Sequence, residues 1–282
     1  MRVLVAGAGG MLGRDVVAAA AALGYECAAL THSDLDVTDG GAVAFAVADA
    51  APDAIINCAA WTDVDGAEHD EVSAFNVNAH GAGNLARAAV AVGARLVQVS
   101  TDYVFEGAAS QPYLESDRTM PQTAYGRTKL AGEHAVLATS TAHAVVRSSW
   151  LFGVHGRNFV TAMLETADAG QREVAVVTDQ VGCPTFTGHL ASRLLEHAAS
   201  GRGGIFHAAA AGWCSWNEFA QAIFAAAGLE VVVTETTTAA LGRAAQRPAW
   251  SVLGTERTTA VLPPWSEGLA DYLALTRNGS RP

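Results

Sequence analysis

The chain has 282 residues, of which 50% are hydrophobic and 16% charged, and this composition excludes disordered, collagen-like and disulfide-scaffold proteins. Seventeen Lys and Arg against 28 Asp and Glu give a formal net charge of −11. No broad basic surface is available to hold a phosphate backbone, so we expect no nucleic-acid partner. A site for a small anion would have to be built locally, from a few Arg residues and backbone N–H groups.

Cysteine usage and apolar runs indicate the compartment. The four Cys form no Cys-x-x-Cys pair, which is typical of buried free thiols in a reducing environment. The longest apolar run, Val16 to Leu23, has eight residues, whereas a membrane span needs about 20. The N-terminus lacks the long apolar segment of a secretory leader. We therefore expect a cytoplasmic protein without a membrane partner.

Short β-branched runs alternate with long Ala-rich stretches over the first half of the chain. The predicted strands are Arg2–Ala6, Glu26–Leu30, Ala54–Asn57, Arg95–Val99 and Ala144–Arg147, and the predicted helices are Met11–Leu23, Gly41–Ala50, Glu71–Val92 and Tyr125–Ala138. Strands and helices that alternate in this way favour right-handed βαβ crossovers. We predict an α/β fold with a Rossmann-type, doubly wound parallel sheet.

The pattern changes after about residue 150. The predicted segments are then a helix at Asn158–Ala169, a strand at Glu173–Val177, a loop at Thr178–Thr185, a helix at Gly188–Ala199, strands at Gly204–Ala208 and Glu230–Thr234, and a final helix at Trp265–Leu275. Ser215 and Glu218 form a capping box that begins one further helix. We predict a first domain at residues 1–150 and a smaller α/β lobe at 151–282, with some segments of the two interleaved.

The first predicted strand runs directly into a glycine loop and then into a helix. The spacing is Gly7-x-x-Gly10-x-x-Gly13, in which small residues allow a tight turn and a close approach of the backbone. The start of the helix then presents free N–H groups and the positive end of its dipole to a pyrophosphate. This loop predicts a dinucleotide site in the first domain, and the alternative is a turn used only for packing.

The segment after the second strand leaves the choice between NAD and NADP open. An acid normally receives the adenosine ribose there, or an Arg meets the 2′-phosphate, and neither follows Leu30 directly. Asp36 either faces the adenosine or caps the next helix, a role that fits Asp34 better. After the third strand, the small residues around Ala60 suit a close approach to a flat ligand, and we expect them to contact the cofactor.

A Tyr and a Lys four residues apart, Tyr125 and Lys129, share one face of a predicted helix. The preceding strand leads into Ser100-Thr101-Asp102, so all three motifs should meet at the C-terminal edge of the parallel sheet. A phenol has a pKa of about 10 and needs a shift to act at pH 7, and we expect the Lys129 ammonium to lower that pKa. Lys129 would also bond the nicotinamide ribose, and Ser100 or Thr101 would orient a carbonyl. The alternative is an exposed Tyr and Lys without a catalytic role.

Seven longer motifs show that the chain resembles the extended short-chain dehydrogenases/reductases, and within them the dTDP-4-dehydrorhamnose reductase family. They are Leu35–Asp39, Asn57–Asp65, Ser100-Thr-Asp-Tyr-Val-Phe105, Tyr125–Glu133, Arg147–Gly153, Asp179-Gln-Val-Gly-Cys-Pro-Thr185 and Arg247-Pro-Ala-Trp-Ser251. The resemblance covers nearly the whole chain. It implies hydride transfer from NADPH or NADH to C4 of a dTDP-linked 4-keto-6-deoxyhexose that is bound by the smaller lobe.

The resemblance also implies roles for single residues. Tyr125 would protonate the forming alkoxide, Lys129 would hold the ribose and tune Tyr125, and Thr101 would be their hydroxyl partner. The cofactor would contact Gly7, Gly10, Met11, Leu12, Gly13, Asp36, Val37, Ala60, Trp61 and Thr62, together with Tyr125 and Lys129. The substrate would contact Val99, Thr101, Asp102, Trp150 and Arg247. The ring face of Trp150 suits the apolar face of a deoxysugar, and its alternative is a plain core side chain.

Two positions depart from the family pattern. Some members bind magnesium through glutamates at a dimer interface, whereas this chain has Asp15 and Thr187-Gly-His189 in those places, so we predict no metal. The Arg-Pro-x-Asn-Ser pattern of many members has Trp250 in place of Asn. The candidates for binding the substrate diphosphate are Arg243, Arg247 and Arg257. We expect a monomer or a homodimer.

Two other functions remain open. Similar enzymes, including the dihydrostreptose synthase type, reduce other nucleotide-bound keto-sugars, and the shared motifs do not separate them. A non-catalytic regulatory subunit, like that of methionine adenosyltransferase, also resembles this family. Such a subunit would permit loss of the acid–base group, yet Thr101, Tyr125 and Lys129 are all present.

Overall fold

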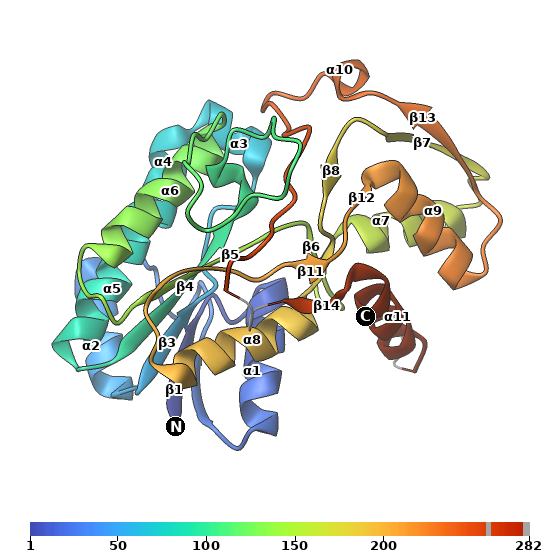
Figure 1. Cartoon of the computed structure of the whole chain (residues 1–282). Helices are drawn as coiled ribbons and strands as arrows, with labels where there is room; N and C mark the ends of the chain where they lie inside the picture. Colours follow the sequence, from blue (N-terminus) through green and yellow to red (C-terminus); the bar gives the residue numbers. More distant parts are fainter. Residues whose placement is uncertain (258–260, 279–282) are drawn as a thin grey trace.

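A six-stranded parallel sheet forms the centre of the molecule (Figure 1). The computed structural model describes residues 1–257 and 261–278. The strands lie in the order β10-β5-β4-β3-β1-β2, with bounds β1 Arg2–Ala6, β2 Glu26–Leu30, β3 Ala54–Asn57, β4 Arg95–Thr101, β5 Ala144–Ser148 and β10 Gly204–His207. The predicted α/β fold with a doubly wound parallel sheet is confirmed.

Helices cover both faces of this sheet (Figure 1). Helices α1 (Met11–Ala22) and α8 (Thr187–Ser200) pack on one face, and α2 (Gly40–Ala50), α5 (Ala82–Ala91) and α6 (Ala124–Leu137) lie on the other. Along β1, Val3 and Val5 face the first layer, whereas Leu4 and Ala6 face the second. Because both faces are buried, the strands read as continuous apolar runs rather than alternating ones.

The sheet reverses its strand order next to β1. Strand β1 pairs with β2 on one side and with β3 on the other, so the chain leaves β1 in one direction and later returns on its opposite side. Ligands of open α/β sheets bind at such a switch point, outside the carboxyl ends of the strands. The topology therefore places the Gly7 loop at the position where a ligand is expected.

The long helix predicted at Glu71–Val92 is present as one helical segment that contains a π-helical turn. The segment contains α4 (Glu71–Phe75), a π-helical turn η1 (Asn76–Gly81) and then α5. A further short helix, α3 (Val64–His69), precedes it. In η1 the buried Asn78 side chain accepts the N–H of Trp61 and donates to the Thr128 hydroxyl of α6, so a polar bridge to the neighbouring segments accompanies the irregular turn.

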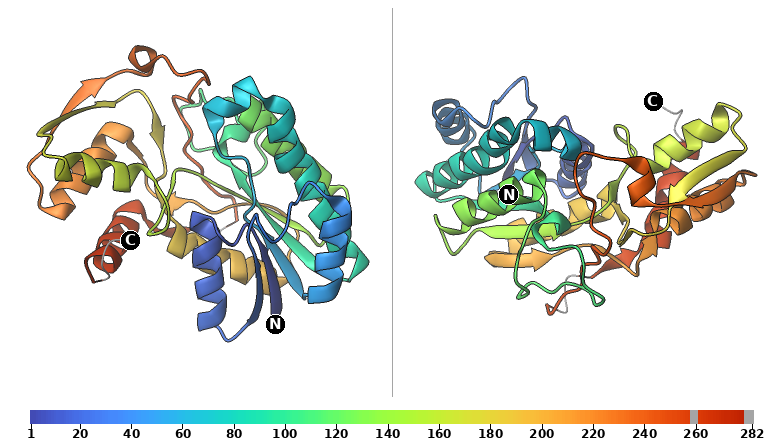
Figure 2. Two further views of the ribbon diagram at one scale, coloured as in Figure 1. Left: turned by 180° about the vertical axis from the view of Figure 1, so that it is seen from behind. Right: turned by 90° about the horizontal axis from the view of Figure 1, so that it is seen from above.

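The remaining elements form a smaller lobe beside the sheet, which Figure 2 shows from two further directions. Its core lies among α7 (Phe159–Asp168), α9 (Trp216–Ala227), α11 (Trp265–Asn278) and the parallel pair β7 (Glu173–Val177) and β13 (Val232–Thr236). Short pairs complete it: β6 (Leu151–Phe152) with β9 (Thr185–Phe186), β8 (Val181–Gly182) with β12 (Cys214–Ser215), and β11 (Ala210–Ala211) with β14 (Leu262–Pro264). The predicted capping box of Ser215 and Glu218 is confirmed at the start of α9.

Two elements from beyond residue 150 complete the main sheet layer. Strand β10 pairs with β5, and α8 packs beside α1. The domain boundary at residue 150 stays a prediction. Within the described residues, no helix has the combined length and apolar character that a membrane span requires.

Candidate active site

A cavity of about 920 Å³ opens at the carboxyl edge of the main sheet. The glycine loop, the ends of β3, β4 and β5, and the start of α6 contribute residues from the sheet side, while β7, α9 and the segment after α10 (Thr238–Leu241) contribute from the smaller lobe. Of the predicted site residues, the cavity is lined by Gly10, Met11, Leu12, Gly13, Ala60, Thr62, Val99, Thr101, Asp102, Tyr125, Lys129, Trp150 and Arg247. The structure thus brings together parts of the chain that lie far apart in the sequence.

The glycine loop packs too tightly for side chains at two positions. Gly7 has a φ of +76°, and a Cβ there would lie 2.6 Å from the Ala59 nitrogen of the segment after β3. A Cβ on Gly13 would lie 2.2 Å from the carbonyl oxygen of Gly7. Gly10 is the N-cap of α1 and offers no side chain to bond the first-turn N–H groups. Those donors remain available to an anion at the helix start.

The residues after β2 do not line the cavity. Asp36 is exposed, and its carboxylate accepts the backbone N–H and the hydroxyl of Thr38, which lower its pKa. The Val37 side chain is buried against Gly81 in the second helix layer. The cap of α2 is Asp39, which accepts two backbone N–H groups, so the alternative of a helix cap at Asp34 or Asp36 is wrong.

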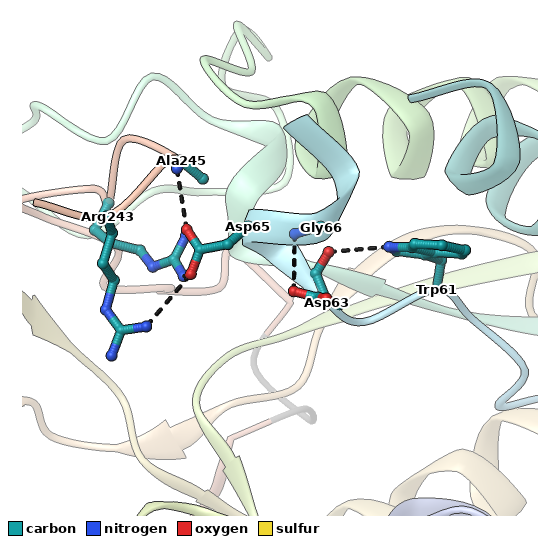
Figure 3. Close-up of polar contacts among 7 residues, drawn as sticks. Trp61, Asp63, Asp65, Gly66, Arg243 and Ala245 are labelled. Atoms are coloured by element: carbon teal, nitrogen blue, oxygen red, sulfur yellow. Dashed lines mark hydrogen bonds and ion pairs between the residues drawn. The ribbon is translucent and has the colours of Figure 1, made fainter. Parts of the chain in front are cut away.

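The segment after β3 divides its side chains between two environments. Ala60 and Thr62 line the cavity, whereas Trp61 packs with Tyr125 beside a small buried cluster around Ala67. The Trp61 indole N–H donates to the carbonyl oxygen of Asp63, as Figure 3 shows. Besides Asp36 and Val37, two more predicted cofactor residues do not line the cavity. These are Trp61 and Gly7, and Gly7 shapes the backbone turn of the glycine loop.

Thr101, Tyr125 and Lys129 converge in the cavity. Thr123 caps the start of α6 by accepting the N–H of Gly126, and this fixes the helix whose first turns carry Tyr125 and Lys129. Tyr125 lines the cavity close to Thr101 at the end of β4, near enough for the Thr101 hydroxyl to lower the pKa of the phenol. The Lys129 Nζ donates to the carbonyl oxygen of Val99 at 2.7 Å.

The electrostatics of this group differ from the expectation. Burial raises the pKa of the Tyr125 phenol to about 12; contact with Thr101 opposes the shift and the Asp102 carboxyl adds to it. The prediction that Lys129 lowers the pKa of Tyr125 is therefore wrong for the chain on its own. Burial also lowers the pKa of Lys129 to about 8, against the charge of Glu133, which raises it. At neutral pH the phenol keeps its proton and the lysine is charged.

Asp102 lies next to this group and is almost fully buried. Its Oδ1 accepts the Thr101 hydroxyl at 2.9 Å. Its Oδ2 is buried and makes no hydrogen bond among the described residues, although the Ser251 hydroxyl is near enough to lower the pKa of the carboxyl. Burial raises the pKa of this carboxyl to about 6. A buried acceptor without a partner, on the cavity wall, is suited to a ligand hydroxyl.

Two stacked indoles form an apolar wall of the cavity. Trp150, which has a φ of +48°, stacks on Trp216 with ring centroids 3.6 Å apart and planes 2° from parallel. Gly182 lies against the Trp150 ring, where a Cβ would approach to 2.4 Å. The Trp216 indole N–H donates to Gln180. Because Gly182 and Trp216 both cover the ring of Trp150, the free face that we expected there for a sugar is absent in this conformation.

Two of the three candidate arginines reach the cavity. Arg243 and Arg247 line it, and both pair with Asp65 of α3. Arg257 instead places its guanidinium over the ring of Phe206, 4.6 Å from the centroid, and does not line the cavity.

The family of the chain follows from comparison with known proteins. The model of the family described as "RmlD substrate binding domain" matches residues 1–278. The chain belongs to this family. It is 43% identical over 294 aligned residues to a dTDP-4-dehydrorhamnose reductase of Streptomyces griseus, covering 100% of this chain and 96% of that protein.

Two further relatives of this RmlD-family chain bear on its chemistry. The crystal structure of a dTDP-4-dehydrorhamnose reductase from Bacillus anthracis in complex with NADP has 36% identity and a TM-score of 0.94, covering 98% of this chain and 99% of that one. A probable dTDP-4,6-dihydroxy-2-methyloxan-3-one 4-ketoreductase of Streptomyces antibioticus is 45% identical over 265 residues, covering 91% of this chain and 88% of that protein. The resemblance stated from the motifs is confirmed.

Sequence reasoning missed several residues of this RmlD-family site. Trp216 lines the cavity, yet no motif contained it, and Gln180, which also lines the cavity, stood inside the Asp179–Thr185 motif without receiving a role. Asp65 stood inside a motif but received no role. The signals available were the capping box directly before Trp216 and the acid at the end of the Asn57–Asp65 motif.

The region that binds magnesium in some family members holds a different set of groups here. Asp15 is half-buried, which raises its pKa, and its carboxylate lies 3.6 Å from the His155 ring. Within residues 1–257 and 261–278, no three His, Cys, Asp or Glu side chains are grouped to hold a metal ion. The absence of a metal stays a prediction.

Proposed function

We propose that the chain is an NADPH-dependent oxidoreductase that reduces the C4 carbonyl of dTDP-4-dehydro-L-rhamnose to give dTDP-L-rhamnose. One observation carries the proposal: a single cavity joins a dinucleotide-type glycine loop, the Thr101, Tyr125 and Lys129 group, and an arginine pair. This arrangement occurs in a chain with full-length similarity to named dTDP-4-dehydrorhamnose reductases.

The glycine loop fits a dinucleotide cofactor. Gly7 and Gly13 make close backbone approaches that any Cβ would block, and Gly10 leaves the first-turn N–H groups of α1 free for a pyrophosphate. A bound nicotinamide supplies the hydride. We favour NADPH because Thr31, not an acid, follows β2 and because the Bacillus anthracis relative binds NADP.

The chain itself supplies the proton and the orientation. As hydride reaches the carbonyl carbon, the C=O π pair moves to oxygen, and Tyr125 donates its phenolic proton to that oxygen; the phenolate then regains a proton from solvent. The raised pKa of Tyr125 keeps the phenol protonated at neutral pH, as this direction requires. Thr101 orients the carbonyl oxygen, and the free Oδ2 of Asp102 accepts a sugar hydroxyl. Lys129 holds the ribose of the cofactor.

The substrate is anchored in two ways under this proposal. Arg243 and Arg247 bind the diphosphate, because planar guanidinium groups match its oxygens. Trp150 and Trp216 line the cavity and contact the apolar part of the deoxysugar by their ring edges, because their stacked faces are covered. We also propose a cytoplasmic location, supported by four free cysteines, and assembly as a monomer or a homodimer stays a prediction.

Turnover of a defined substrate tests the proposal. Purified protein with NADPH and dTDP-4-dehydro-L-rhamnose should consume NADPH and give dTDP-L-rhamnose, identified by mass and NMR spectra. Tyr125→Phe should lower kcat by about 10²–10⁴-fold with NADPH affinity intact. Tyr25→Phe, which removes a hydroxyl far from the cavity lining, is the matched control and should leave kcat unchanged. Full turnover by Tyr125→Phe would refute the assigned proton donor.

A reductase of a different dTDP-linked keto-sugar is the second candidate. The Streptomyces antibioticus ketoreductase is as similar to this chain as the named dTDP-4-dehydrorhamnose reductase of Streptomyces griseus. A small panel of dTDP-keto-sugars separates the two. If dTDP-4-dehydro-L-rhamnose is left untouched while another keto-sugar consumes NADPH, the second candidate is correct, and no turnover of any member would favour a regulatory subunit.

A further inference from the structure

Asp65 connects the two halves of the molecule at the rim of the cavity (Figure 3). It lies in the first turn of α3, which comes from the sheet half. Its Oδ1 accepts the backbone N–H of Ala245 at 3.0 Å, and its Oδ2 accepts Arg247 Nη2 at 2.7 Å and Arg243 Nη1 at 3.3 Å. One carboxylate thus holds the backbone and both arginines of a segment from the smaller lobe.

The two arginines are held differently. The Arg247 side chain is only 13% exposed, and its second terminal nitrogen, Nη1, is buried without a hydrogen-bond partner among the described residues. The Arg243 side chain is 53% exposed. Both line the cavity. A buried guanidinium nitrogen that has no acceptor costs free energy unless a ligand oxygen accepts its hydrogen bond. The Nη1 of Arg247 therefore indicates an oxygen-rich ligand in this part of the cavity.

Arg247 lines the same cavity as Tyr103 and Tyr125. Its positive charge acts on the hydroxyl of Tyr103, whose ring packs edge-on against Tyr125 with centroids 5.5 Å apart. Burial tends to raise the pKa of Asp65, but the Ala245 N–H and the two guanidinium groups outweigh it and lower that pKa. The Asp65 carboxylate is therefore charged at neutral pH and maintains its ion pair with Arg247.

We propose that Asp65 is a positioning residue for the substrate: by engaging Arg247 Nη2 and the Ala245 N–H, it aims Arg247 Nη1 at a diphosphate oxygen of the nucleotide sugar. Arg243 is the second, more exposed donor at the rim. This inference rests on the proposed nucleotide-sugar substrate and adds to it a residue that never touches the ligand. Asp65 acts by fixing the guanidinium in the orientation that the diphosphate needs.

The alternative is that Asp65 only stabilises the fold. The pair with Arg243 joins side chains that are 53% and 30% exposed and contributes little to stability. Toward Arg247, which is 13% exposed, an Asn at position 65 keeps an amide oxygen that can still accept a hydrogen bond. The same segment is anchored independently near Pro248, against Gly107, and at Trp250, whose N–H donates to the Gly107 carbonyl. Loss of the Asp65 charge should therefore change ligand binding more than folding.

Asp65→Asn tests this, with Asp63→Asn as the matched control (Figure 3). Asp63 lies two residues earlier and caps α3 by accepting the Gly66 N–H at 2.9 Å, a role that Asn performs equally well. The measurements are dTDP affinity by calorimetry, NADPH affinity by fluorescence, KM and kcat for the nucleotide sugar, and Tm. These readouts separate substrate binding from cofactor binding, catalysis and stability.

In Asp65→Asn we expect dTDP affinity to fall and the nucleotide-sugar KM to rise by about tenfold, with kcat, NADPH affinity and Tm nearly unchanged. Asp63→Asn should match the wild type in all five. Unchanged or tighter dTDP binding in Asp65→Asn would overturn the inference, as would an equal loss in Asp63→Asn.

A double-mutant cycle gives an independent check. If Asp65 acts through Arg247, then Arg247→Gln and the double variant should bind dTDP equally weakly, because the second change has nothing left to remove. Additive losses would contradict the inference. Failure of the proposed function looks different. If the chain acts on another dTDP-linked keto-sugar, the wild type still binds dTDP and the Asp65 test stands; if the substrate is not a dTDP sugar, the wild type does not bind dTDP and the present inference loses its ligand.

Discussion

Gly13→Ala is the most direct test of the glycine loop, because the change is one methyl group. The added Cβ would lie 2.2 Å from the Gly7 carbonyl oxygen and 2.9 Å from the Ala8 Cα, whereas ordinary contacts begin at 3.4 Å. Both neighbours are backbone atoms, so no side-chain rotation relieves the contact. The start of α1 must move away from β1 by more than 1 Å, the difference between 2.2 and 3.4 Å.

The size of the effect follows from this displacement. Overpacking of this kind costs about 1–3 kcal/mol, and at about 2–4 °C per kcal/mol the Tm should fall by roughly 2–12 °C. The shift also moves the first-turn N–H groups of α1 away from the pyrophosphate position. A hydrogen bond to a charged group contributes about 1.5–3 kcal/mol, so losing one weakens NADPH binding by roughly 10–100-fold.

The assay is NADPH binding by fluorescence titration, together with a thermal melt. Gly9→Ala is the matched control, because its Cβ would meet only the Thr31 methyl group at 3.4 Å and its φ lies outside the left-handed region. We expect Gly9→Ala to bind NADPH like the wild type. Tight binding by Gly13→Ala, or an equal loss in both variants, would refute the reasoning.

Two other predictions concern the buried charges beneath the site. Burial lowers the pKa of Lys129 to about 8, so the ammonium loses its proton above that pH. We therefore expect kcat/KM for NADPH to fall about tenfold per pH unit above about pH 8. A pH profile of kcat/KM that stays flat to about pH 9.5 would contradict this. Because the folded pKa is below the unfolded one, the native chain binds fewer protons between about pH 8 and 10.5, and stability should rise with pH across that window. Glu133→Gln leaves the buried Arg147 guanidinium without its carboxylate partner, which should lower the free energy of unfolding by about 3–5 kcal/mol in denaturant. The same change removes the negative charge that raises the pKa of Lys129, so the loss of activity at alkaline pH should begin at a lower pH. Normal stability and an unchanged onset of that loss in Glu133→Gln would show that the pair is not coupled to the site.

The sequence-predicted fold is accurate where a simple physical rule applies. Strands buried on both faces read as apolar runs, and all five strands predicted in the first half occur, with β4 and β5 extending a residue or two further. The helix predicted at Glu71–Val92 occurs as one unbroken helical segment to Ala91, but it contains the π-helical turn η1, where Asn78 bonds to Trp61 and Thr128. A tertiary contact of this kind leaves no trace in local propensity.

In the candidate site, too, some features could be predicted from the sequence and others depend on tertiary contacts. The Gly10, Thr101 and Lys129 motifs meet because the carboxyl ends of parallel strands share one edge, which the alternating pattern already predicts. The pairing of Asp65 with Arg247 joins residues separated by 182 positions, and no spacing rule predicts it. The stacking of Trp216 on Trp150 likewise depends on how the smaller lobe folds onto the sheet.

An acidic chain can hold an anion if the orientation of a few positive groups counts for more than their number. Charges farther away than about 8 Å are largely screened at physiological salt, so most of the −11 net charge does not oppose a ligand in the cavity. At the proposed diphosphate site, Asp65 would offset one of the two arginine charges, which reduces attraction, but it would also fix Arg247 before the ligand arrives. Ordering a long side chain on binding costs about 0.5–1.5 kcal/mol, and a guanidinium already held by a carboxylate avoids that cost. Asp65 would therefore weaken the positive potential that attracts the diphosphate and strengthen the hydrogen bond from Arg247 to it. The dTDP affinity of Asp65→Asn tests which of these two effects is larger.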